Sequence, residues 1–117
     1  MKRLTLLIAF IAISITSFSQ QNKYYEGRFD RAKIFAQVAA DEFNLTAEQQ
    51  EELYTKKLKH FEDQFAANKK FKAGEISEEE KKQPNKEFGK YFNKLTGKTY
   101  KELKPFYAKV KKEIDKL

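Results

Sequence analysis

Residues 45–74 read LTAEQQEELYTKKLKHFEDQFAANKKFKAG and carry the longest helical pattern of the chain. Thr46 can cap a helix, and the side chain of Gln49 can reach back to the amide of the cap, which together make a capping box. Apolar residues then recur at steps of four, three and four, which is the spacing of a packing seam: Tyr54, Leu58, Phe61 and Phe65. Glycine at position 74 ends the pattern. The stretch therefore predicts one long helix between Thr46 and Gly74.

A second helix is predicted before this stretch, over residues 28–43, with a break at Asn44 and Leu45. Its apolar residues again follow helical spacing, with Ile34 beside the main stripe: Phe35, Val38, Ala39 and Phe43.

Two more helices are predicted after Gly74. Ser77 and Glu80 form another capping box, but Pro84 lies too deep for a first turn and should kink or split the helix that follows. That helix carries an apolar stripe up to Thr96 and Gly97: Phe88, Tyr91, Phe92 and Leu95. Thr99 and Glu102 supply a third possible box, although Pro105 favours a start of the last helix near Lys104.

These patterns contain no strand alternation and predict an all-α fold. We expect four amphipathic helices in a thin, hairpin-like layer, with four aromatic residues in its core: Phe61, Phe65, Phe88 and Phe92. Such a layer lacks a second face to pack against, so we expect a homodimer.

The N-terminus has the features of a secretory signal peptide. Lys2 and Arg3 precede an uncharged stretch, residues 4–19, that is shorter than the roughly 20 residues of a membrane span. Ser17 and Ser19 are small residues at the positions that a signal peptidase reads, so we predict cleavage after Ser19. The mature protein is then a single domain, residues 20–117, that is exported, has no membrane span and does not meet intracellular nucleic acid.

The composition favours binding over catalysis. The 117 residues include no Cys and one His, which leaves no thiolate nucleophile or thiolate metal site and little for a catalytic triad. His60 with Asp63 could contribute to a metal site, but neighbouring lysines oppose a dication, and a surface or hydrogen-bonded histidine is the favoured interpretation. The run at positions 78–80 is interpreted as an acidic helix start. We expect a non-enzyme without metal or cofactor.

Leu45, Thr46 and Gln49 lie in the sequence LTAEQ, and this motif resembles the LTxxQ signature of the Spy-like periplasmic proteins. The predicted export, the absence of Cys and the helical pattern agree with that family. A second copy of the signature is incomplete here, because residues 95–99 read LTGKT. The resemblance implies a cradle-shaped antiparallel dimer of long helices that binds unfolded envelope proteins without ATP.

Charge is distributed unevenly along the mature chain. Residues 20–80 have 10 basic and 13 acidic residues, whereas residues 81–117 have 12 basic and 4 acidic. Five lysines recur every four residues in the basic part and form the predicted lysine stripe: Lys82, Lys86, Lys90, Lys94 and Lys98. Neighbouring like charges are mildly destabilising on a helix. The stripe as a whole is interpreted as a surface that steers acidic or unfolded clients, and each single lysine as a solubilising residue.

Aromatic residues outnumber the aliphatic ones, since the mature chain has 15 Phe or Tyr and only 11 Leu, Ile or Val. A helical chain of this size buries only part of its apolar surface. We expect the aromatic residues that lie off the main stripes to be accessible: Tyr24, Tyr25, Phe29, Phe71 and Tyr100. Phe29, Phe71 and Tyr100, with the lysine stripe, are the predicted client-binding residues.

Together these features predict a periplasmic holding chaperone for unfolded or misfolded envelope proteins. Two alternatives remain open. One is an accessory regulator that docks on the sensor domain of a membrane kinase during envelope stress. The other is a basic structural protein that binds anionic envelope lipids or polymers through the lysine stripe alone.

Overall fold

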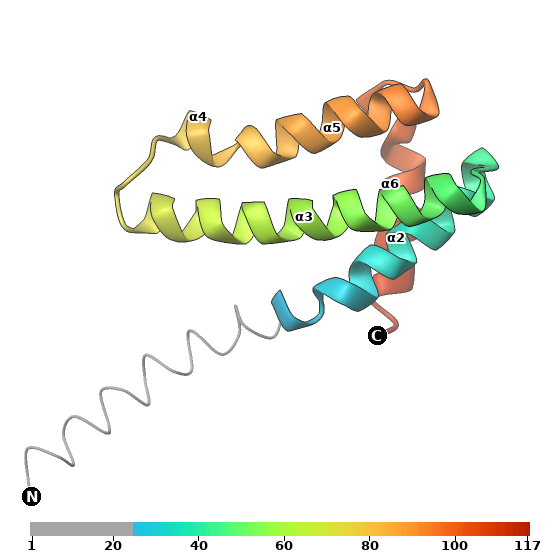
Figure 1. Ribbon diagram of the computed structural model, residues 1–117, viewed down its shortest axis with the longest axis horizontal. Coiled ribbons are helices and arrows are strands. Elements are labelled where there is room, and N and C mark those ends of the chain that lie inside the picture. The colour runs from blue at the N-terminus through green and yellow to red at the C-terminus, as the bar shows by residue number, and fades with distance from the viewer. Residues whose placement is uncertain (1–24) are drawn as a thin grey trace, which may run out of the picture.

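The computed structural model describes residues 25–117, which form helices and no strand (Figure 1). The all-α prediction is confirmed for this part of the chain, whereas the predicted signal peptide, its cleavage site and Tyr24 lie outside the described residues. The helices, in chain order, are α2 (Arg28–Phe43), α3 (Ala47–Lys72), α4 (Glu78–Lys81), α5 (Gln83–Thr96) and α6 (Tyr100–Ile114).

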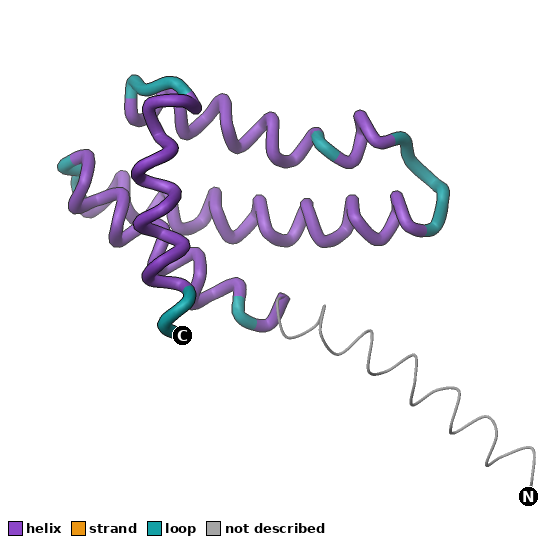
Figure 2. The backbone as a smooth tube through the Cα atoms, turned by 180° about the vertical axis from the view of Figure 1, so that it is seen from behind, coloured by secondary structure: helices purple, strands orange, loops and turns teal. Residues whose placement is uncertain are grey.

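The longest helix, α3, is the centre of the arrangement. After a turn, α4 and α5 run back along α3, while α2 packs against both α3 and α6. In Figures 1 and 2, α6 runs crosswise to α3 near the end where α2 and α3 are joined. The core therefore gathers at this end of the molecule. No helix among residues 25–117 is long and apolar enough to cross a membrane.

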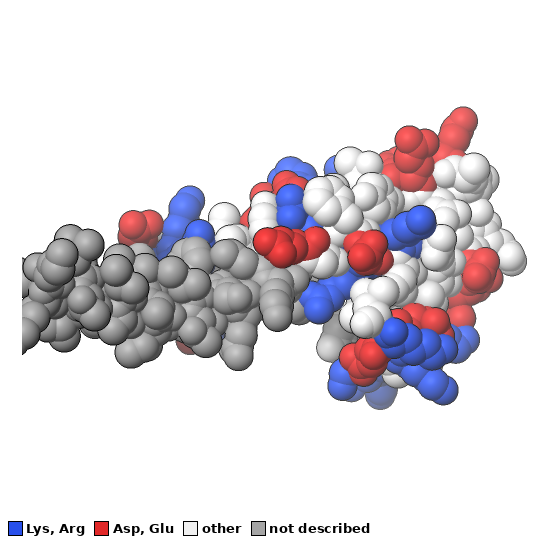
Figure 3. Space-filling model, turned by 90° about the horizontal axis from the view of Figure 1, so that it is seen from below, with Lys and Arg blue, Asp and Glu red and all other residues white. Residues whose placement is uncertain are grey.

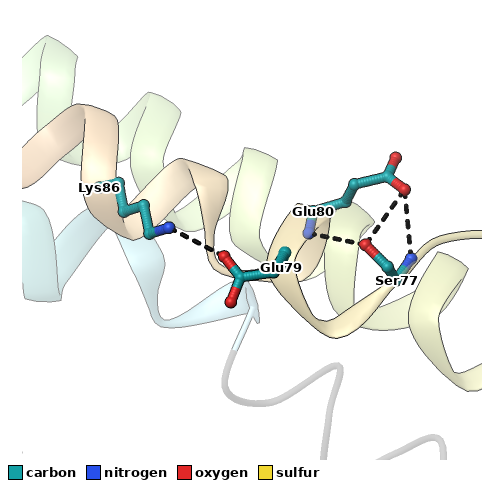
Figure 4. A network of polar contacts seen from close by, with 4 residues as sticks. All are labelled: Ser77, Glu79, Glu80 and Lys86. Atoms are coloured by element: carbon teal, nitrogen blue, oxygen red, sulfur yellow. Dashed lines mark hydrogen bonds and ion pairs between the residues drawn. The ribbon is translucent and has the colours of Figure 1, made fainter.

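Three predicted capping boxes are confirmed, and each starts a helix. The Thr46 hydroxyl accepts from the Gln49 amide at 3.1 Å, and the Thr46 amide donates to the Gln49 side chain at 2.9 Å. Reciprocal boxes also open α4 and α6, and Figure 4 shows the one at Ser77. Each box provides partners for backbone amides that a helix start would leave unpaired.

Pro84 splits the helix that the sequence predicts after Ser77, so the described chain has five helices where four were predicted. Helix α4 ends at Lys81, and Pro84 lies in the first turn of α5. Proline fits there because the amide that it lacks has no partner in a first turn.

The predicted start of α6 near Lys104 is wrong. Helix α6 begins at Tyr100, directly after the Thr99 cap, and continues through Pro105. Proline removes one backbone hydrogen bond, but the capping box and the burial of Leu103 and Phe106 hold the helix on both sides of it.

The core is mostly aromatic. Its largest fully buried side chains come from four helices: Phe35, Leu53, Phe92, Leu103 and Phe106. The Phe35 ring centroid lies 5.0 Å from that of Phe92 and 5.2 Å from that of Phe106, distances typical of interacting rings. Burial ends well before the far tip of the hairpin, since Ala67 is the last buried residue of α3 and α4 has none.

On α3 the buried stripe differs from the predicted seam. Leu53 and Lys57 are buried, whereas Tyr54, Leu58, Phe61 and Phe65 are only half-buried. The prediction that Phe61 and Phe65 belong to the core is therefore wrong, while Phe88 and Phe92 are buried as predicted. The residues of α3 that α2 and α5 cover are Leu53 and Lys57. The predicted seam of Tyr54 and Leu58 lies one position further along the chain and is therefore turned partly away from these two helices.

Candidate functional site

The LTAEQ motif forms the turn between α2 and α3. Asn44 adopts a left-handed conformation with φ 51°, which asparagine tolerates, and the Leu45 amide donates to the Ala40 carbonyl at 3.1 Å. Leu45 packs against the core, while the polar groups of Thr46 and Gln49 serve the capping box. In this chain the motif fixes how two helices are joined.

The predicted lysine stripe lies along α5 and the residues that flank it, and all five of its lysines are exposed. In the described part of the chain only Lys86 of the five forms an ion pair, with its amine 3.1 Å from a carboxylate oxygen of Glu79 (Figure 4). That hydrogen bond lowers the pKa of Glu79. Phe88 and Phe92 fill the opposite face of α5, so the helix separates a charged side from a buried aromatic side.

The three predicted client-binding aromatic residues are exposed: Phe29 by 47%, Phe71 by 36% and Tyr100 by 66%. They lie at the ends of three different helices, α2, α3 and α6. The Lys81 amine lies 4.5 Å from the Phe71 ring centroid, and Tyr100 comes two residues after Lys98. The stripe therefore has an exposed aromatic residue near each of its ends. Tyr25, predicted to be accessible, is instead half-buried, because its ring stacks on Phe65 at 4.4 Å.

Charge is mixed on other parts of the surface. Figure 3 shows one face of the molecule, on which acidic and basic side chains lie beside one another. Besides the pair of Lys86 with Glu79, two ion pairs link separate helices among residues 25–117: Glu42 of α2 with Lys109 of α6 at 2.6 Å, and Arg28 of α2 with Glu62 of α3 at 3.5 Å. The series of exposed lysines along α5 is thus a local feature of the surface.

A buried lysine is the main feature that sequence reasoning missed. Lys57 is only 9% exposed, and its amine lies 4.4 Å from the ring centroids of both Phe35 and Phe88 and 5.0 Å from that of Phe61. The amine also lies 3.2 Å from Nδ1 of His60. One signal was available in the sequence, because position 57 lies one turn after Leu53 on the same face of α3.

His60 continues this contact to the next helix. Its Nε2 lies 2.6 Å from Oδ1 of Asn85 on α5, and its ring stacks on Phe88 with 4.8 Å between centroids. Of the two predicted alternatives, a surface or a hydrogen-bonded histidine, the structure has the hydrogen-bonded one. No group of three or more acidic, cysteine or histidine residues among positions 25–117 is arranged to hold a metal.

Burial shifts the pKa values of both bases. It lowers the pKa of Lys57 to about 7. For His60, burial is the larger cause and the Lys57 charge the second, and they lower its pKa to about 4. Near neutral pH His60 is therefore uncharged, so Nδ1 accepts from Lys57 while Nε2–H donates to Asn85.

A second polar contact ties α5 to α3. The Tyr91 hydroxyl donates to the Glu52 carboxylate at 3.2 Å, and burial together with that carboxylate raises the pKa of Tyr91 to about 12. The α3–α5 interface thus consists of aromatic rings between two hydrogen-bonded contacts.

Comparisons of the chain with models of known families, with curated proteins and with solved structures find no match. A function is therefore proposed from the exposed lysines and aromatic residues described above and from the resemblance of the LTAEQ motif.

Proposed function

We propose that this protein is an ATP-independent periplasmic holding chaperone for unfolded or misfolded envelope proteins. The observation that carries the proposal is the exposure of all five stripe lysines, with Phe71 and Tyr100 exposed near the two ends of the stripe.

The two kinds of residue would act in different steps. A surface of one sign speeds the encounter with oppositely charged clients, and this effect weakens as salt rises. Exposed rings then bury apolar area of the client with few side-chain rotors to immobilise. Many weak contacts of this kind allow capture, and also release without nucleotide.

We also propose that two copies assemble into an antiparallel cradle. The family resemblance suggests this arrangement. Its physical support is that Phe29 and Leu117 keep 47% and 67% of their surface exposed in the single chain. Sedimentation of the purified protein, with Phe29→Ser as the variant expected to weaken association, tests the dimer separately from the chaperone activity.

Light scattering tests the function directly. A chemically unfolded client is diluted into the predicted mature chain, residues 20–117, without nucleotide at low and at high salt. We expect suppression of aggregation near stoichiometric ratios and less suppression at high salt.

Matched variants separate the stripe from net charge. Neutralising Lys86, Lys90 and Lys94 to Gln should weaken suppression, whereas neutralising the exposed α6 residues Lys101, Lys104 and Lys112 changes the net charge equally and should weaken it less. Phe71→Ser with Tyr100→Ser should also weaken it. Suppression that all three variants share with the parent protein would refute the proposal.

One competing function is favoured by the same stripe, namely binding to an anionic envelope surface. In that case the stripe variant should lose binding to anionic vesicles, while the aromatic variants should bind as the parent does. Failure to suppress aggregation at several-fold excess, by a protein that circular dichroism shows to be helical, would favour a specific partner such as a sensor-kinase domain.

A further inference from the structure

An open groove of about 340 Å³ lies between α2 and α3, and only residues of these two helices line it. Ala36, Ala47 and Tyr54 give it an apolar surface, and Ala36 is almost fully buried. The turn of the LTAEQ motif joins the two helices next to the groove, since Ala47 is the first residue of α3. The fold itself therefore sets the spacing of its two walls.

An exposed ring lies on the same face of α2 as the groove. Phe29 is 47% exposed, and the Arg28 guanidinium lies 4.4 Å from its ring centroid. Phe29 precedes Lys33 by one turn and Gln37 by two turns, so it stands in one row with these two lining residues. The ring is thus about 10–12 Å from the groove along the helix axis. A cavity of roughly 150 Å³ can hold a benzene ring, so the groove is large enough for a phenylalanine side chain.

The two walls of the groove carry opposite charges that do not pair with each other. Lys33 lies on the α2 wall and Glu51 on the α3 wall, and both are exposed. Within residues 25–117 neither of them forms an ion pair. A cation and an anion are therefore available to a partner that brings the opposite arrangement.

A second copy of the chain brings this arrangement. About a two-fold axis a patch pairs with the same patch of the other molecule, and every contact occurs twice. When α2 of one copy lies antiparallel to α2 of the other with the axis near Lys33, Phe29 of each copy faces the groove of the other. The two Lys33 side chains then approach the axis, and Glu51 of the opposite copy can neutralise each of them.

We propose that this face of α2 and α3 joins two copies of the chain, with Phe29 of each copy inserted into the groove of the other and Lys33 of each paired with Glu51 of the other. The inference rests on the dimer part of the proposed function and names its interface. Helix α5, which carries the lysine stripe, contributes no residue to the groove, so the stripe stays free in both copies.

Exchange of the two charges tests the interface. The protein, purified in the form that cells accumulate, is studied by sedimentation over a range of concentrations. We expect Lys33→Glu and Glu51→Lys each to raise the Kd of the dimer about tenfold or more, because each creates two contacts between like charges. The double variant should restore the Kd of the parent protein.

An equimolar mixture of the two single variants gives the decisive result. In the mixed dimer both pairs join opposite charges, although each chain still has like charges on its own groove, so the mixture should associate as tightly as the parent. Association as weak as that of each variant alone would overturn the proposal. Lys70→Glu, at an exposed position of α3, is the matched control and should leave the Kd unchanged. An equal loss in this control would assign the effect to net charge and would also overturn the proposal.

Phe29→Trp tests the insertion of the ring. The chain has no tryptophan, so this variant carries a single fluorescent indole at the proposed contact. Its emission should shift to shorter wavelength over the concentration range in which the dimer forms. Constant emission through that range would show that the ring stays in solvent and would contradict the proposed insertion.

These results are separable from the proposed chaperone activity, which light scattering measures independently. A protein that is monomeric at all concentrations would overturn the dimer and this interface together. A dimer whose Kd none of the groove variants changes would overturn the interface alone.

Discussion

Replacement of Lys57 by Met should stabilise the protein at pH 7. Methionine has a similar length and no charge, so it can fill the space among Phe35, Phe61 and Phe88 without desolvating an amine. The amine of Lys57 has its pKa lowered from 10.5 to about 7, which corresponds to about 5 kcal/mol of unfavourable burial. Attraction to three rings and the lost contact with His60 offset part of this value, so we expect a net gain of about 2 kcal/mol.

The dependence on pH follows from the same shift. Between pH 7 and 10.5 the unfolded chain holds the Lys57 proton while the folded protein has released it. The free energy of unfolding of the parent protein should therefore rise with pH across this window, and the advantage of Lys57→Met should disappear toward its upper end.

Thermal unfolding followed by circular dichroism from pH 6 to pH 10 measures this effect. A gain of about 2 kcal/mol raises the Tm of a domain of this size by about 8–16 °C. The control is Lys59→Met, which removes an exposed lysine from the same helix and should change stability by less than about 0.5 kcal/mol. A destabilised Lys57→Met at pH 7, with a parent protein whose stability does not rise above pH 7, would show that the rings hold Lys57 charged and would refute the reasoning.

Three further substitutions test the fold. Thr46→Ala removes the cap of α3 and should cost about 1 kcal/mol in a urea titration, whereas Thr46→Ser should cost less because it keeps the hydroxyl. Phe92→Ala opens a cavity in the aromatic core and should cost about 3–5 kcal/mol, and a smaller loss in the same titration would mean that the core collapses around the gap. Pro105→Ala restores a backbone hydrogen bond inside α6 and should stabilise the protein by about 1 kcal/mol or more; an unchanged Tm would show that α6 has already adapted to the proline.

Local signals in the sequence predicted the helices well. The bounds of α2 were predicted as the structure has them, and the three capping boxes were recognisable, because each depends on residues only three positions apart. Pro84 was predicted to kink or split the helix that follows Ser77, and the structure has the split. These features are decided within one or two turns of chain.

Features that depend on the partner helix were harder to predict. Phe61 and Phe65 fit a packing seam by spacing, yet α2 and α5 cover the neighbouring line through Leu53 and Lys57. A lysine in a helical pattern is ordinarily solvated. Only the positions of three rings from separate helices show that the amine of Lys57 is enclosed.

The candidate site divides in the same way. Exposure of the lysine stripe, Phe29, Phe71 and Tyr100 followed from their places outside the apolar stripes. The contact between His60 and Asn85 did not, because these residues are 25 positions apart and their contact depends on the register of α5 against α3.

The position of the core at one end of the hairpin has a consequence for its other end. From position 68 to position 87 no residue is buried, and the tip is held by small contacts such as the Gln64 amide donating to the Lys81 carbonyl at 3.1 Å. This segment can open as a separate cooperative unit while the aromatic core stays closed, so its amide protons should exchange with solvent far faster than those of α6. The tip is also where evolution could lengthen or shorten the molecule by whole turns without disturbing the packing that holds it together.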